Sequence, residues 1–234
     1  MIGYASNTGT RRNLQALRDN GWRILLTPDN PTPREGLRYG IDNGAWGAFQ
    51  KQQPFDVKAF KTLVERRGGA ADFVIVPDIV AGGEQSLDFS ASWLPYLRPI
   101  RNLLLPVQDG MNPSRVGAWL SAWTNLGVFL GGSTEWKLRT MYGWGMVAHS
   151  HGRHYHVGRV NSKRRIRLAH EAGADSIDGT SATMYSCFRA WAHLHRVNGG
   201  SDPAYLLAMQ HADLMEQWAR RHGKKADLPK DLAK

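Results

Sequence analysis

Short apolar runs alternate with helical patterns along most of the chain, and this alternation constrains the fold more than any other feature. Two runs, Asp72–Pro77 and Leu103–Val107, are apolar almost throughout, as in strands of a parallel sheet that is covered on both faces. Eight strands are predicted, at Ile2–Ser6, Trp22–Thr27, Arg38–Asp42, Asp72–Pro77, Leu103–Val107, Gly127–Leu130, His154–Gly158 and Ala174–Ile177. Helical patterns occur at Thr8–Asn20, Phe55–Arg67, Glu84–Leu97, Asn112–Thr124, Thr134–Val147 and Asn161–Ala172, and again at Ser181–Val197 and Pro203–Arg221. The pattern predicts an α/β fold, a (β/α)8 TIM barrel with extra C-terminal helices; an open doubly wound sheet is the alternative.

One connection fits a barrel poorly. The segment Pro28–Leu37 is rich in proline and has no helical pattern. It is also short for a crossover between parallel strands, which needs about a dozen residues. We therefore expect Trp22–Thr27 and Arg38–Asp42 to pair as a hairpin, or one of them to lie outside the barrel.

Composition limits the class of protein. A chain of 234 residues without a linker predicts one catalytic domain over 1–221, followed by a basic, flexible tail over 222–234. No long apolar run or leader is present, so we expect a cytoplasmic protein with no membrane partner. The one cysteine, Cys187, excludes a multi-cysteine zinc site. A net charge of +10 favours a nucleic-acid partner, although a merely basic surface would give the same number.

Polar or glycine residues follow most of the predicted strands. In a barrel these positions share one rim; they are Asp42, Asp78, Gln108, Gly131, Gly132, Gly158 and Asp178. An amide, carboxylates and approachable main-chain NH groups of Gly131 and Gly132 would suit the edge of a guanine-like base. Asp42 and Asp178 would be the reacting pair, one attacking an anomeric carbon and the other protonating the leaving group. The plainer alternative is that polar residues simply end strands before loops.

Five motifs in order resemble the tRNA-guanine transglycosylase superfamily, and most closely the compact branch of phages and bacteria that inserts 7-deazaguanines into DNA. The matching segments are Ile41–Gly44 followed by Phe49, Pro77–Ile79, Pro106–Gly110, Phe129–Gly132, and Val157–Arg159 with Gly173–Asp178. The resemblance spans about residues 41–181, and its last motif is the most specific.

The resemblance implies a base-exchange glycosyltransferase that replaces guanine in DNA with a 7-deazaguanine such as 7-cyano-7-deazaguanine. Asp178 would be the nucleophile and Asp42 the general acid and base, while Asp78, Gln108 and the backbone of Gly131 and Gly132 would read the base, helped by Asn43 and Gly158. The partners would be duplex DNA with a flipped guanine and the free base, with no cofactor or metal. The oligomeric state stays open, a homodimer included.

Two departures from the family bear on the substrate. The tRNA enzymes carry a Cys/Cys/Cys/His zinc subdomain, whereas this chain has only Cys187, which favours DNA over tRNA. The first Gly of the Val-Gln-Gly-Gly motif is Asp109 here, which would change base selectivity. The same exchange on tRNA or another RNA remains an alternative.

Histidine residues lie before and on the seventh predicted strand, and basic residues lie at and after its end. Arg159, Lys163 and Arg164 lie near the rim and would contact phosphates, unless they form an ordinary solvated helix face. His149, His151, His154 and His156 form a dense run, and His154 and His156 would share one face of a strand. We expect one of them to line the barrel near the pocket and the others to contact phosphates or solvent. A metal-dependent TIM-barrel hydrolase that uses this run is the alternative function.

Overall fold

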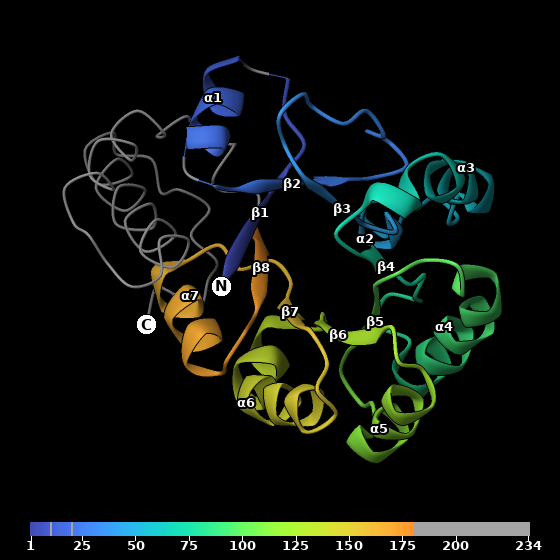
Figure 1. Cartoon of the computed structure of the whole chain (residues 1–234). Helices are drawn as coiled ribbons and strands as arrows, with labels where there is room; N and C mark the ends of the chain where they lie inside the picture. Colours follow the sequence, from blue (N-terminus) through green and yellow to red (C-terminus); the bar gives the residue numbers. More distant parts are fainter. Residues whose placement is uncertain (10, 20, 180–234) are drawn as a thin grey trace.

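The fold is a closed barrel of parallel strands with helices outside it (Figure 1), which confirms the predicted (β/α)8 TIM barrel. The structure is a computed structural model that describes residues 1–9, 11–19 and 21–179. Its strands are β1 (Ile2–Ser6), β2 (Arg23–Leu26), β3 (Tyr39–Ile41), β4 (Val74–Ile75), β5 (Leu103–Val107), β6 (Leu126–Leu130), β7 (Tyr155–Val157) and β8 (Ser176–Gly179). Each strand is parallel to its neighbours, and the pairing of β8 with β1 closes the ring.

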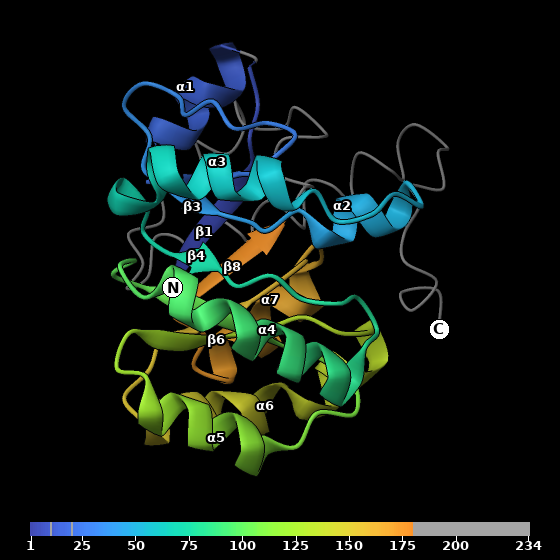
Figure 2. The same ribbon diagram turned by 90° about the vertical axis from the view of Figure 1, so that its right-hand side faces the viewer.

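The helices lie on the outer side of the ring, as the two views in Figures 1 and 2 show. They are α1 (Arg11–Asp19), α2 (Ala45–Gln50), α3 (Val57–Arg67), α4 (Gly83–Leu97), α5 (Pro113–Ala122), α6 (Thr134–Ser150) and α7 (Lys163–Glu171), with a 3-10 turn at Gly68–Ala70. Every one of these helices except α2 begins and ends within three residues of its predicted bounds. The further helices expected at 181–197 and 203–221, and the tail at 222–234, lie outside the described residues.

Helix α2 was missed because a glycine occupies its N-cap position and the capping side chains stand before it. Its N-terminal flank is Gly44, which has a positive φ of 80° and no side chain that could cap the helix. The cap comes instead from the two residues before it: the Asp42 carboxylate accepts from Gly44 N, and the Asn43 amide oxygen accepts from Ala45 N. Both are side chains of the rim, so α2 begins where the rim begins.

The expectation for β2 and β3 was wrong, since the two strands are parallel neighbours inside the barrel. No helix covers the connection, but twelve residues separate Leu26 from Tyr39. At about 3.3 Å per extended residue such a segment reaches much farther than the length of a four-residue strand. Asn7, just after β1, holds this segment in place by donating to the carbonyl oxygens of Asn30 and Thr32.

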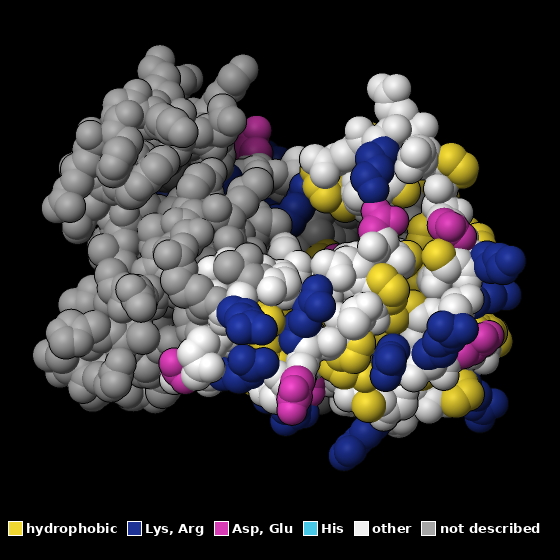
Figure 3. Space-filling view, turned by 90° about the horizontal axis from the view of Figure 1, so that it is seen from above, with side chains coloured by type: hydrophobic (Ala, Val, Ile, Leu, Met, Phe, Trp, Pro, Cys, Tyr) yellow, Lys and Arg dark blue, Asp and Glu magenta, His cyan; other side chains and the backbone are white. Residues whose placement is uncertain are grey.

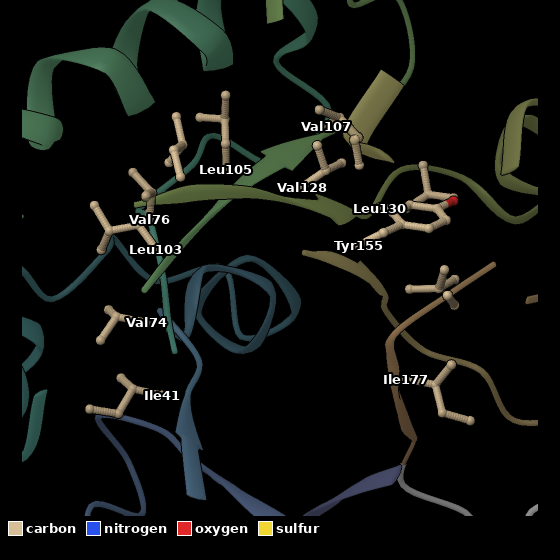
Figure 4. Packing of buried hydrophobic residues seen from close by; sticks show 14 of the residues in the cluster. Ile41, Val74, Val76, Leu103, Leu105, Val107, Val128, Leu130, Tyr155 and Ile177 are labelled. Carbon is tan, nitrogen blue, oxygen red and sulfur yellow. The ribbon is translucent and has the colours of Figure 1, made fainter. Parts of the chain in front are cut away.

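Alternation along the strands divides the core into two layers. In β5, Leu103, Leu105 and Val107 point toward the helices, as Figure 4 shows for the outer layer, whereas Leu104 points into the barrel. The inner cluster consists of Ile2, Tyr4, Leu25, Phe73, Ile75, Leu104 and Phe129. Strands β7 and β8 contribute no apolar side chain to that cluster, and their buried polar residues include His156 and Ser176. Among the described helices, none is long and apolar enough to cross a membrane.

Candidate active site

Two neighbouring cavities open at the C-terminal ends of the strands. The smaller has a volume of about 450 Å³ and the larger about 790 Å³. Five residues line both of them: Asp42, Asn43, Trp46, Arg159 and Asp178. The two carboxylates expected to react therefore lie on the boundary between two spaces, although well over a hundred positions separate them in the chain.

Asp42 lies directly after β3, and because successive strand residues point to opposite faces, its side chain points into the barrel. Its backbone NH donates to Leu26 O of the neighbouring strand, and its carboxylate accepts from Gly44 N at 2.7 Å. Burial raises the pKa of Asp42 to about 6; the Gly44 hydrogen bond opposes this, and the charges of Asp178 and Asp78 add to it. Asp42 can therefore hold or release a proton near neutral pH.

Asp178 has the opposite electrostatic environment. Burial by itself would raise its pKa, but His156, the backbone NH of Arg159 and the ammonium group of Lys137 together hold the pKa of Asp178 below its usual range. The His156 ring nitrogen Nε2 lies 3.0 Å from one carboxylate oxygen, and Arg159 N donates to the other at 3.0 Å. Asp178 is thus an ionised carboxylate whose side chain is 13% exposed, toward the cavities.

One wall of the smaller cavity consists of hydrogen-bond acceptors. Asn43 donates to Asp78 and to Val76 O, both at 2.8 Å, which fixes the Asp78 carboxylate. Burial raises the pKa of Asp78 to about 6, against the effects of Asn43 and Arg159. The amide nitrogen of Gln108 donates to Ser86 Oγ and Ile79 O, so its carbonyl oxygen is the atom that remains for a ligand.

The glycines of the rim act mainly through their small size. Gly131 was expected to offer its main-chain NH to a ligand, but that NH donates to Val107 O in the sheet. The NH of Gly158 likewise donates to Leu130 O, and its carbonyl oxygen accepts from Lys137. A Cβ at Gly158 would lie 2.5 Å from the Phe129 ring, and one at Gly132 would lie 2.6 Å from the Asp109 carboxylate. These positions therefore allow close packing around the cavity.

Asp109 ties two loops of the rim together. Both of its carboxylate oxygens accept from Ser133, one from the backbone NH and one from the hydroxyl. Ser133 in turn caps α6 by accepting from Trp136 N. Asp109 thus anchors the start of α6 to the loop that follows β5.

Of the three basic residues expected to meet phosphates, Arg159 lies in the mouth itself. Its backbone has a positive φ of 56°, its guanidinium donates to Gly132 O, and it stacks 4.3 Å above the centre of the Trp46 ring. Lys163 is the first residue of α7, and Arg164 is exposed on the same helix. On the face shown in Figure 3, Lys and Arg side chains lie among acidic and apolar ones.

Lys137 is a site residue that sequence reasoning missed. It is 4% exposed and donates to Gly158 O, and burial, with the charge of Arg159, lowers its pKa to about 7. A signal was present, because Lys137 occupies the first position of the apolar stripe of α6, ahead of Met141, Trp144 and Ala148. A lysine at such a position must be buried and must have a polar partner.

The histidine run separates into two groups. His154 and His156 are two positions apart, so they face the same side, and both contact Ser176 Oγ in the barrel interior. His149 instead pairs with Asp175, and His151 contacts Val147 O. Among the described residues, no three His, Cys, Asp or Glu side chains are grouped so as to hold a metal ion. No observation therefore favours the metal-dependent hydrolase.

Comparisons with known proteins give information on the fold alone. No protein-family model matches the chain, and no curated protein matches its sequence. Among solved structures, the chain is similar to QR15, an aldolase, with 14% identity, a TM-score of 0.52, and coverage of 85% of this chain and 96% of the other. A cube-shaped protein cage designed by fusing symmetric oligomeric domains matches with 10% identity and a TM-score of 0.49, over 99% of this chain and 80% of that one.

Proposed function

We propose that the protein exchanges guanine in DNA for a 7-deazaguanine through a covalent intermediate on Asp178. The observation that carries the proposal is the opposite displacement of two carboxyl pKa values within one mouth. Asp42, with a raised pKa of about 6, suits an acid that later becomes a base, and Asp178, with a lowered pKa, suits a nucleophile. Retaining glycosyl transfer requires such a pair.

The proposed reaction has two half-reactions. First, an oxygen of Asp178 bonds to C1′ as the C1′–N9 bond breaks, and Asp42 gives its proton to the departing guanine. Then the incoming base loses its N9 proton to Asp42, and N9 bonds to C1′ as the ester bond to Asp178 breaks. Protons and electrons balance, so the exchange consumes no other reactant.

The smaller cavity has the chemistry of a purine site. The Asp78 carboxylate and the free oxygen of Gln108 are acceptors for ring and exocyclic NH groups of a guanine-like base. The larger cavity shares Asp42, Arg159 and Asp178 with it, which suits a sugar at the boundary and a strand beyond it. The target base would have to leave the duplex stack to enter.

Aromatic side chains at the rim support a nucleic-acid partner. Trp46 and Phe49 are stacked with ring centres 5.8 Å apart, and they are 40% and 54% exposed. Exposed rings beside a cavity are suited to stacking on unpaired bases, and Arg159 above Trp46 adds a positive charge for phosphate.

Incubation with duplex DNA and labelled 7-cyano-7-deazaguanine, followed by nucleoside analysis, tests the proposal. We expect label in the DNA with the wild-type chain, none with Asp178→Ala, and a denaturation-resistant protein–DNA adduct when free base is withheld. Asp88→Asn is the matched control, since it removes an exposed carboxylate on α4 that is paired with Arg115. A tRNA arm in the same assay separates DNA from RNA as substrate. Exchange that survives in Asp178→Ala would refute the nucleophile, and no exchange into either nucleic acid would refute the function.

A further inference from the structure

A line of hydrogen-bonding side chains crosses the barrel interior behind Asp178. His156 Nε2 lies 3.0 Å from Asp178, His156 Nδ1 lies 2.7 Å from Ser176 Oγ, and Ser176 Oγ lies 2.7 Å from His154 Nε2. His156 comes from β7 and Ser176 and Asp178 from β8, with His156 and Ser176 in register, and His154 directly precedes β7. The line therefore consists of inward-facing residues along two adjacent strands.

The far end of the line reaches a different surface. His154 is exposed, and it helps to line a cavity of about 350 Å³ at the N-terminal ends of the strands, together with Tyr4, Arg23 and Asp72. None of these residues lines the two cavities at the mouth. The interior line therefore connects the candidate nucleophile to solvent at the opposite end of the barrel.

Aromatic rings seal the middle of the line. His156 is fully buried, with the Phe129 ring stacked on it at 5.3 Å and the rings of Phe73 and Tyr4 at 5.2 and 5.9 Å. The titratable groups that face it are Asp178 of β8, His154 before β7 and Tyr4 of β1. Water is thus excluded along the side of His156, and its nitrogens contact only Asp178 and Ser176.

Counting donors fixes the direction of the line. An ionised carboxylate only accepts, so Nε2 of His156 carries the proton that points at Asp178. In a neutral ring Nδ1 then accepts, so the hydroxyl of Ser176 donates to it. Because Ser176 has one proton, its oxygen must accept from Nε2–H of His154. A second arrangement exists with His156 doubly protonated, in which Nδ1 donates to Ser176 and the hydroxyl turns toward His154.

We propose that His154, Ser176, His156 and Asp178 form one proton-transfer chain, through which His156 positions the Asp178 carboxylate and exchanges protons with solvent at the far end of the barrel. A proton that binds to Nδ1 of His154 displaces the proton on Nε2 to Ser176, and the Ser176 proton moves to Nδ1 of His156. His154 stays neutral and His156 gains one positive charge, with no bond to carbon made or broken.

Such a chain would keep the interior charge balanced while substrate fills the mouth. Where His156 is doubly protonated, formation of an ester on Asp178 removes the negative charge that faces it, and the chain lets the additional proton leave His156 by the opposite end. This consequence rests on the proposed function, whereas the chain itself does not. Although part of His154 is exposed, desolvation of its ring, with the neighbouring His156, lowers the pKa of His154 to about 4, which agrees with a neutral His154 at that end.

NMR of the free, 15N-labelled full chain tests the proposal without any nucleic acid. We expect the Nε2 nitrogen of both rings to carry a proton, and a change in the protonation of His156 to shift the ring signals of His154. Ser176→Ala should abolish this linkage and release the His154 tautomer, while His151→Gln, outside the chain, should change neither ring. In His156→Leu, which has no donor, the carboxyl carbon of Asp178 should titrate about one pH unit higher, because a hydrogen bond to a charge is lost.

Two results would overturn the chain. One is a neutral Nδ1–H tautomer for His156, and the other is a Ser176→Ala protein in which the two rings remain linked. His154→Gln, at the exposed end, provides a second break in the chain if Ser176→Ala does not fold. If the signals of the two rings change together but the protein exchanges no base, the proton-transfer chain stands and the proposed function is refuted. If the protein exchanges bases but the signals of the two rings change independently, the function stands and the chain is refuted.

Discussion

Replacement of Asp42 by asparagine should stabilise the folded protein at high pH while removing the proposed acid. The pKa of Asp42 is raised from 3.8 to about 6, first by burial and then by the charges of Asp178 and Asp78, against the Gly44 hydrogen bond. A raised carboxyl pKa means that the folded state binds the proton more tightly than the unfolded state. Stability from this group is therefore full below about pH 4 and is lost as pH rises through 6. A shift of about two units corresponds to roughly 3 kcal/mol.

The neutral Asp42→Asn side chain avoids that cost and can still accept from Gly44 N. At pH 8 we expect the free energy of unfolding to exceed that of the wild type by up to about 3 kcal/mol, and at pH 4.5 the difference should fall to about 1 kcal/mol. Urea unfolding at the two pH values measures both.

Asp109→Asn is a matched control with the opposite sign. Its two bonds from Ser133 outweigh burial and lower the pKa of Asp109, so ionised Asp109 stabilises the fold at pH 8. The Asp109→Asn protein should be less stable than the wild type at pH 8, with a smaller deficit at low pH. If Asp42→Asn is destabilising at pH 8, or equally stabilising at both values, the electrostatic reasoning about the mouth is wrong.

Three further predictions concern the proposed exchange. Guanine release needs protonated Asp42 and should slow above pH 6, whereas capture of the incoming base needs ionised Asp42 and should slow below pH 6. Single-turnover assays of each half-reaction measure these two pH dependences, and both should disappear in Asp42→Asn. Asn43→Ala removes two buried hydrogen bonds and a partly buried one, and should cost about 2–3 kcal/mol in urea unfolding, with a rise in KM for the free base; a fall in kcat alone would contradict its assignment to the base wall. Trp46→Ala should weaken DNA binding about tenfold in fluorescence anisotropy, while Tyr142→Ala, exposed on α6, should not; equal effects would rule out stacking at the mouth.

Most elements of the fold could be predicted because their signals are local. The apolar runs that became β4 and β5, and the Asn112–Pro113 start of α5, depend on residues next to one another in the chain. The exceptions depend on distant partners. The Asn43 side chain that caps α2 is oriented by its bonds to Val76 O and Asp78, and the parallel pairing of β2 with β3 depends on a loop held by Asn7.

The site was accessible from sequence only in part. Asp42, Gln108 and Asp178 follow or end strands, and the alternation of strand residues turns them toward one mouth. Asp78 has the parity of the outward-facing Val74 and Val76, so the segment after β4, and not the alternation, brings it to the same cavity. Which atoms of these residues are free to bind a ligand could not be predicted from the sequence. Gly131 gives its NH to the sheet, the Gln108 amide nitrogen is already bonded, and Lys137 enters from a helix rather than a strand.

The sequence by itself determined an eight-stranded parallel barrel with carboxylates at one rim, because strand and helix periodicity and strand-end residues are properties of neighbouring positions. Only the tertiary structure decided how those carboxylates differ. Asp42 and Asp178 have the same intrinsic pKa, but their pKa values in the folded protein shift in opposite directions. Asp42 is buried near two other carboxylates, whereas Asp178 faces His156, Lys137 and the backbone NH of Arg159. Desolvation and Coulomb interactions depend on distances in space, and the order of residues along a chain does not specify those distances.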